Sequence, residues 1–125
     1  MPMKALYIDD DEDIGTIAVL CLQLNETFDA RHAPSGAEGL DIAADWAPDV
    51  ILLDVMMPVM DGPTTRRKLK ENPATADIPV IFVTAKTQQN ELETLSGLGA
   101  LGTIAKPFEP VTFADDIVHL LGTGA

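Results

Sequence analysis

The chain is poor in cysteine, in basic residues and in long apolar runs, and each shortage excludes a class of protein. A single cysteine, Cys21, excludes an internal disulfide and any zinc site built from several cysteines. It lies in an apolar helical pattern, which favours a buried, unreactive thiol. No apolar run approaches the roughly 20 residues that a membrane-spanning helix needs. With 8 basic against 20 acidic residues and a net charge of −12, we expect the surface to repel nucleic acids and anionic membranes.

What is present indicates one globular domain over residues 1–125. Hydrophobic residues make up 46% of the chain and charged residues 22%, enough apolar material for a substantial core. The first strand pattern begins almost at the first residue and leaves no room for a signal peptide, so we expect a cytoplasmic protein. Half of the basic residues lie close together, which favours a solvated helix face over a docking site: Arg66, Arg67, Lys68 and Lys70.

The most informative stretch is Asp49–Gly62, D-V-I-L-L-D-V-M-M-P-V-M-D-G. Four consecutive apolar residues lead directly to Asp54, a pattern typical of a strand buried on both faces of a parallel sheet. Chemistry in such sheets is found at the carboxyl ends of the strands, so we expect Asp54 at the mouth of a crevice. Pro58 and Gly62 then favour a turn. An acid in this place can be a nucleophile, a metal ligand, a general base or a cap.

Strand and helix patterns alternate along the rest of the chain. Acidic residues 11–13 suit the positive end of the first helix, and Ser35 begins a capping box with Glu38. The alternation predicts an α/β fold: a doubly wound, five-stranded parallel sheet of order 2-1-3-4-5 with five helices. The expected strands are 4–8, 28–33, 50–53, 78–83 and 100–105, and the expected helices are 14–25, 36–46, 63–71, 88–96 and 110–121.

The ends of the parallel strands meet at one edge and bring polar residues together there. Strand 1 delivers Asp9 and Asp10, strand 3 Asp54, strand 4 Thr84 and strand 5 Lys106. Three carboxylates in one crevice repel one another, so some take up protons or a cation neutralises them. Hard oxygen ligands suit Mg²⁺, while a lysine and a hydroxyl can hold phosphoryl oxygens. This set favours phosphoryl transfer to Asp54, which stands alone on the middle strand.

Four segments in this order resemble the response-regulator receiver domain over essentially the whole chain. They are Y-I-D-D-D-E-D at 7–13, the stretch 49–62, I-P-V-I-F-V-T-A at 78–85 and K-P-F at 106–108. The resemblance implies a flavodoxin-like fold and phosphorylation of Asp54 by a phosphohistidine on a sensor histidine kinase or a histidine phosphotransfer protein.

The resemblance also implies a role for each of the other site positions and a Mg²⁺ cofactor. Asp10 and Asp54 would bind Mg²⁺ directly, Asp9 through water, and the backbone carbonyl of Met56 would be a further ligand. Thr84 and Lys106 would hold the phosphoryl oxygens. A cis peptide before Pro107, and an influence of residues 56 and 86 on phosphoryl lifetime, follow from the same resemblance.

One position departs from the receiver pattern. Thr103 stands three residues before the lysine, where receivers often have an aromatic residue that swings inward on activation. We therefore expect a stand-alone receiver that signals through a downstream protein target as an effector, a relay intermediate or a phosphate sink. We expect no enzymatic activity beyond its own phosphotransfer and dephosphorylation. The alternative is a receiver-like binding module that works without phosphorylation.

Rival patterns are weaker. Residues 9–13 partly match a calcium loop, but Ile14 and Leu20 occupy the positions where that loop needs glycine and glutamate. Residues 97–102 spell G-x-G-x-x-G, yet follow a helix pattern and lead into a strand, which favours a helix C-cap over a dinucleotide site. His32 and His119 have no implied catalytic partner. The apolar surplus of the first helix is either core or a docking face.

Overall fold

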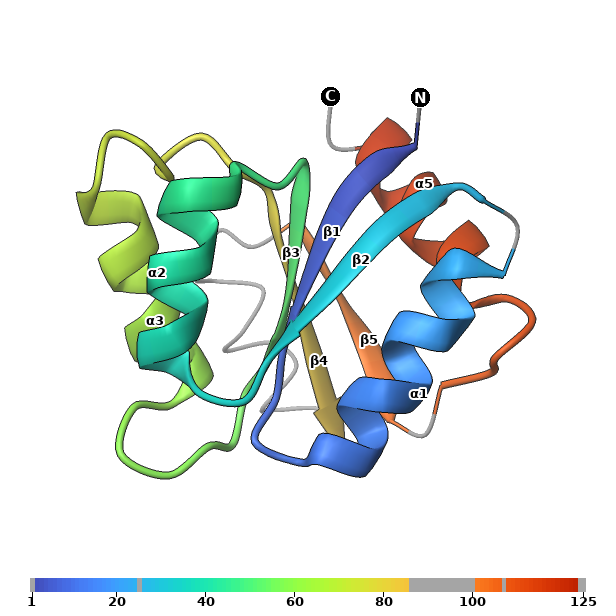
Figure 1. Ribbon diagram of the computed structural model, residues 1–125, viewed down its shortest axis with the longest axis horizontal. Helices are drawn as coiled ribbons and strands as arrows, with labels where there is room; N and C mark the ends of the chain where they lie inside the picture. The colour runs from blue at the N-terminus through green and yellow to red at the C-terminus, as the bar shows by residue number, and fades with distance from the viewer. Residues whose placement is uncertain (1, 25, 86–100, 107, 124–125) are drawn as a thin grey trace.

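Five parallel strands form one sheet in the order β2-β1-β3-β4-β5, as predicted (Figure 1). The computed structural model describes residues 2–24, 26–85, 101–106 and 108–123. β1 and β3 are neighbours although β2 lies between them in the sequence, which creates the switch point of a doubly wound sheet. The strands are β1 Met3–Ile8, β2 Phe28–Ala33, β3 Val50–Asp54, β4 Val80–Ala85 and β5 Gly102–Lys106.

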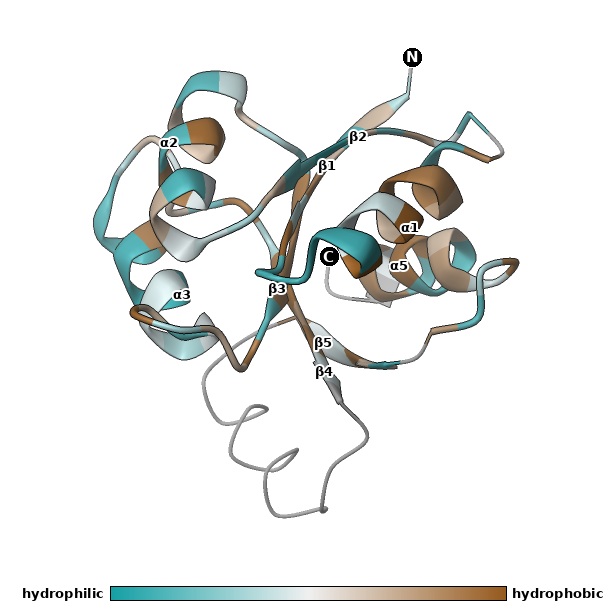
Figure 2. Cartoon of the chain, turned by 60° about the horizontal axis from the view of Figure 1, so that its bottom comes forward, coloured by the Kyte–Doolittle hydropathy of each residue, from teal (hydrophilic) through white to brown (hydrophobic). Residues whose placement is uncertain are grey.

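Helices cover both faces of the sheet. α2 and α3 lie on one face, and α1 and α5 on the other (Figures 1 and 2). A further predicted helix, residues 88–96, lies outside the described residues. None of the helices that the structure describes is long and apolar enough to cross a membrane. The helices are α1 Glu12–Gln23, α2 Gly36–Trp46, α3 Gly62–Glu71 and α5 Phe113–Thr123.

The central strands are buried on both faces because their alternate side chains enter two separate cores. In β3, Val50 and Leu52 pack into the core beneath α1 and α5, whereas Ile51 and Leu53 pack into the core beneath α2 and α3. All four side chains are fully buried. This two-sided burial explains the unbroken apolar run in the sequence.

Side-chain caps fix where three helices begin. Asp11 accepts a hydrogen bond from the backbone N–H of Ile14, and Asp61 accepts one from that of Thr64. Ser35 Oγ accepts from the N–H of Glu38, which confirms its prediction as a cap. Because α1 is capped by residue 11, it starts two residues earlier than predicted.

Most of the other boundaries differ from the prediction by one to three residues, and the largest differences are in β4, β5 and α5. β4 begins at Val80, not at residue 78, because the N–H of Ile78 already donates to the Thr75 carbonyl and Pro79 has no N–H. β5 runs from Gly102 to Lys106 instead of 100–105. α5 begins three residues late, because residues 109–112 form a turn that the Phe113 N–H closes onto the Glu109 carbonyl.

α1 is rich in apolar residues (Figure 2), and some of them are exposed. Ala18 and Leu22 are fully buried, and Cys21 is buried as predicted. By contrast, Ile17, Leu20 and Leu24 are 49%, 61% and 63% exposed. These three side chains are therefore not part of the core, and the docking-face alternative fits them better.

Candidate functional site

Residues at or just after the ends of three strands converge at the carboxyl edge, which is at the bottom of Figure 1. Asp9 directly follows β1, while Asp54 and Lys106 are the final residues of β3 and β5. Side chains alternate along a strand, so each of these residues lies on the same face as the residue two positions earlier. Those earlier residues belong to the core beneath α1 and α5: Tyr7, Leu52 and Ile104.

One cation joins the two buried carboxylates. Lys106 Nζ lies 3.2 Å from Asp9 Oδ2 and 3.0 Å from Asp54 Oδ1. Asp9 is fully buried and Asp54 is 4% exposed. Lys106 reaches them from β5 across β4, so the ion pairs connect strands that are not neighbours in the sheet. The predicted convergence of these residues is confirmed.

The carboxylates of Asp9, Asp10 and Asp54 form a group that could hold a metal ion. One oxygen from each lies within 4.8 Å of the others, and Asp10 is exposed. Three negative charges against the single positive charge of Lys106 leave an excess of about two, which a divalent cation balances. An all-oxygen donor set with one side open to water fits Mg²⁺.

Electrostatics perturbs the protonation of the site. Burial raises the pKa of Asp54 to about 6 from the ordinary 3.8, against the opposing effect of its hydrogen bond to Lys106. The negative charge of Asp9 adds to the rise. For Lys106, burial lowers the pKa, but the attraction of the two carboxylates exceeds this effect and raises it overall. Lys106 therefore stays charged, whereas Asp54 is unusually easy to protonate.

Two further residues contact Asp9, and the sequence analysis did not assign them to the site. The Tyr7 hydroxyl donates to Asp9 Oδ2 at 2.9 Å, and His32 Nε2 lies 2.8 Å from the Asp9 carbonyl oxygen. Burial and the charge of Asp9 raise the pKa of Tyr7 far above its ordinary value, so the phenol keeps its proton. A side chain at Gly15 would collide with the His32 ring. The two-residue spacing of Tyr7 and Asp9 was the available signal.

The loop after Asp54 is tightly wound. The Gly62 N–H donates to the Val55 carbonyl and closes the loop, and the Met60 N–H donates to the Pro58 carbonyl. Val59, which lies between Pro58 and Met60, has φ 68°. A hydrogen bond between residues two apart around a residue with positive φ forms a γ-turn of the rare and strained type. Met56, whose backbone carbonyl is the predicted metal ligand, lies in this loop with a side chain that is 76% exposed.

The remaining predicted positions are placed as follows. Thr84 is buried near the end of β4, where it is the register partner of Ala105. Thr103 lies on β5 and lines a hollow of about 420 Å³ between β5 and α5, together with Phe108 and Leu120. Lys86, Pro107 and most of the glycine-rich motif at 97–102 lie outside the described residues.

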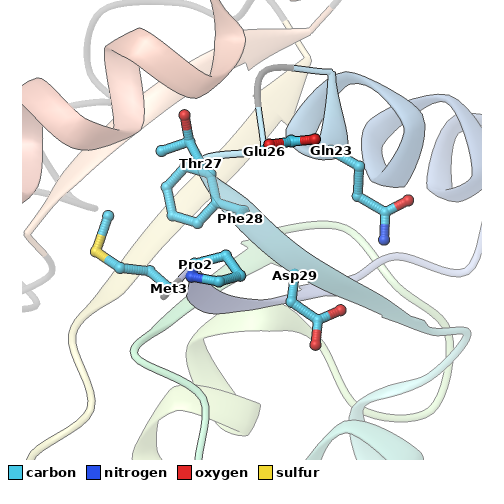
Figure 3. A pocket seen from close by; sticks show the side chains of 7 residues that line it. All are labelled: Pro2, Met3, Gln23, Glu26, Thr27, Phe28 and Asp29. Carbon is cyan, nitrogen blue, oxygen red and sulfur yellow. The ribbon is translucent and has the colours of Figure 1, made fainter.

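A second hollow, of about 820 Å³, lies at the opposite edge of the sheet (Figure 3). Phe28 and Met3, which are register partners at the first positions of β2 and β1, line it with Pro2. Its charged lining residues, Glu26 and Asp29, are exposed. None of the predicted site residues lines this hollow.

The chain is similar to known response regulators in sequence and in structure. Residues 5–118 match the family described as the response regulator receiver domain. The chain is 40% identical over 114 residues to the response regulator PleD of Caulobacter vibrioides, covering 89% of this chain and 24% of PleD. It is 36% identical over 107 residues to the DNA-binding dual master transcriptional regulator RpaA of Synechocystis, covering 85% of this chain and 44% of RpaA. It therefore spans less than half the length of either relative.

Solved structures agree with the sequence relatives. The structure of the Vibrio cholerae chemotaxis protein CheY4 superimposes with a TM-score of 0.87 at 28% identity, covering 96% of this chain and 99% of that one. A response regulator from Desulfuromonas acetoxidans gives a TM-score of 0.86 at 25% identity, covering 97% and 98%. Since the family match extends from residue 5 to residue 118, this chain belongs to the response-regulator receiver family.

Proposed function

We propose that this receiver accepts a phosphoryl group on Asp54 in a Mg²⁺-dependent reaction and so transmits a two-component signal. The observation that carries the proposal is the pairing of Lys106 with both Asp9 and Asp54 at the carboxyl edge. An Asp54 oxygen attacks phosphorus in a phosphohistidine, and the P–N bond breaks. Its electron pair returns to the imidazole, which takes up a proton, and Asp54 becomes an acyl phosphate.

The neighbouring residues would bind the metal ion and the phosphoryl oxygens. Asp10 and Asp54 would hold Mg²⁺ directly, Asp9 through water, and the Met56 carbonyl would add a ligand. The ion would offset the negative charge that accumulates when a phosphoryl group approaches three carboxylates. Lys106 and Thr84 would hold phosphoryl oxygens, Lys106 as a point charge and Thr84 as a hydroxyl donor.

The exposed apolar side chains of α1 support a protein as the phosphate donor. Ile17, Leu20 and Leu24 form an apolar strip on the helix that begins beside Asp9 and Asp10. We propose that a helical surface of a histidine kinase or phosphotransfer protein covers this strip while its histidine reaches Asp54. The phosphorylated domain then acts through a downstream protein in the cytoplasm, not as an enzyme on a separate substrate.

The output route differs from that of receivers with an aromatic residue at position 103. Thr103 lines the hollow between β5 and α5 but carries no ring that could swing inward on activation. This feature favours a phosphorelay intermediate or a phosphate sink over an effector driven by an aromatic switch. The competing function is a binding module whose contacts do not depend on phosphorylation.

Labelling with acetyl phosphate tests the proposal directly. In the presence of Mg²⁺ we expect intact mass spectrometry to show one added phosphoryl group, and chelation of Mg²⁺ to prevent it. Asp54→Asn should abolish labelling because the attacking oxygen is replaced. Asp41→Asn, on the exposed surface of α2, is the matched control and should be labelled normally. Absence of labelling in the native chain, beside a receiver that is labelled, would favour the binding module.

A further inference from the structure

Tyr7, the single tyrosine of the chain, has a fixed position next to the site. It is fully buried on β1, two residues before Asp9 and on the same face of the strand. Edge-to-face contacts hold its ring against Phe108 and Phe113, with centroid distances of 6.4 and 6.5 Å. Such packing leaves the hydroxyl little freedom to move.

The hydroxyl shares its acceptor with the lysine of the site. Asp9 Oδ2 accepts from Tyr7 at 2.9 Å and from Lys106 Nζ at 3.2 Å, while Asp9 Oδ1 accepts from the Asp11 N–H at 3.0 Å. Lys106 has a second acceptor in Asp54 Oδ1. Two donors of different kinds therefore meet at one buried oxygen: a charged amine at the end of an unbranched chain and a neutral phenol whose ring is packed in the core.

The two donors behave differently when a phosphoryl group arrives. If Lys106 turns from the carboxylates to a phosphoryl oxygen, Asp9 Oδ2 loses its charged donor. Asp9 is then held only by the Asp11 N–H on Oδ1 and by the phenol on Oδ2, and an oxygen of a buried carboxylate that lost both of its donors would carry a desolvation cost. The phenol cannot follow the lysine, since its ring is packed in the core, and it remains bonded to the same oxygen.

We propose that Tyr7 is a positioning residue that keeps Asp9 hydrogen-bonded when Lys106 leaves it for a phosphoryl oxygen. This inference rests on the proposed function, because it presumes that Lys106 serves the phosphoryl group. Tyr7 lowers the cost of releasing Lys106, so it favours the phosphoryl-bound state over the unmodified one. A purely structural tyrosine would stabilise both states equally.

Tyr7→Phe removes the donor and keeps the ring. We would measure Mg²⁺ binding by calorimetry and the binding of beryllofluoride with Mg²⁺ by fluorine NMR. We expect Mg²⁺ affinity within about threefold of native and beryllofluoride affinity about tenfold lower, as for the loss of one hydrogen bond to a charged group. Thr75→Val is the matched control, because it removes a buried hydroxyl that donates to Leu69 away from the site. It should lower stability and change neither affinity.

The outcomes separate this inference from the proposed function. A native chain that binds no beryllofluoride would overturn the proposed function and this inference with it. A native chain that binds it, with Tyr7→Phe showing equal changes for both ligands or none, would overturn the inference alone.

A double-mutant cycle gives an answer that needs no phosphoryl analogue. Tyr7→Phe and Lys106→Met each remove one of the two donors to Asp9 Oδ2, and the double variant removes both. In urea without Mg²⁺, we expect the double variant to lose more in unfolding midpoint than the sum of the single losses. Additive losses would show that the two donors do not substitute for each other and would overturn the inference.

Discussion

At the carboxyl edge of the sheet, Asp9 and Asp54 are almost completely buried and both pair with Lys106. At the amino edge, by contrast, two basic side chains lie against an aromatic ring near the surface. There Trp46 ends α2, with Arg31 4.4 Å and Lys4 5.7 Å from its ring centroid. Removing one partner at the carboxyl edge leaves another buried charge uncompensated. At the amino edge, water replaces a lost partner. Substitutions at the carboxyl edge should therefore change stability strongly and non-additively, whereas substitutions at the amino edge should change it little.

A glycine-to-alanine substitution made once at each edge, at Gly62 and at Gly122, should show this contrast most strongly. A Cβ at Gly62 would lie 2.3 Å from the Asp54 carbonyl oxygen and 2.9 Å from Val55 Cα, both backbone atoms that cannot turn away. Gly62→Ala should therefore lower the free energy of unfolding by about 2 to 3 kcal/mol and impair labelling of Asp54. Urea unfolding and intact mass check the two effects.

The control lies near the end of α5, at the amino edge. A Cβ at Gly122 meets no atom within 4 Å, so Gly122→Ala should leave stability unchanged or slightly increased. Equal effects of the two substitutions would contradict the difference between the edges.

A second test uses the raised pKa of Asp54. Between about pH 4 and 6 the folded carboxyl holds a proton that the unfolded chain has released, so stability falls as pH rises through this window. The penalty persists above pH 6 and reaches about 3 kcal/mol at most. In chelator, the native chain should therefore lose stability relative to Asp54→Asn from pH 4 to pH 6. Parallel pH profiles for the two proteins would show that Asp54 titrates normally.

The smallest expected effect concerns Trp46, the single tryptophan. Because it lies at the end of α2 remote from the carboxylates, saturating Mg²⁺ should leave its fluorescence unchanged. Arg31→Met should alter the emission without Mg²⁺, since it removes the cation above the ring. Strong quenching by Mg²⁺ would mean that the two edges communicate.

The sequence predicted the strand order and the gathering of Asp9, Asp54 and Lys106, because both follow from the alternation of strands and helices and from strand-end positions. It could not assign the apolar faces of α1, since apolar residues lie around most of that helix and only packing decides which face is covered. The sequence also did not indicate a role for Tyr7 at the site. A tyrosine in a strand is ordinary, and its hydroxyl matters only because Lys106 arrives from a strand about 100 residues later.

The γ-turn at Val59 means that the loop following Asp54 stores conformational energy. A β-branched residue at φ 68° costs about 1 to 3 kcal/mol, and the Val59 side chain, fully exposed, recovers none of it by packing. The hydrogen bond from Met60 to Pro58 closes the turn itself, and the one from Gly62 to Val55 closes the loop around it. A rearrangement that opened this loop would release the stored energy, so the closed loop persists only because its hydrogen bonds offset that cost.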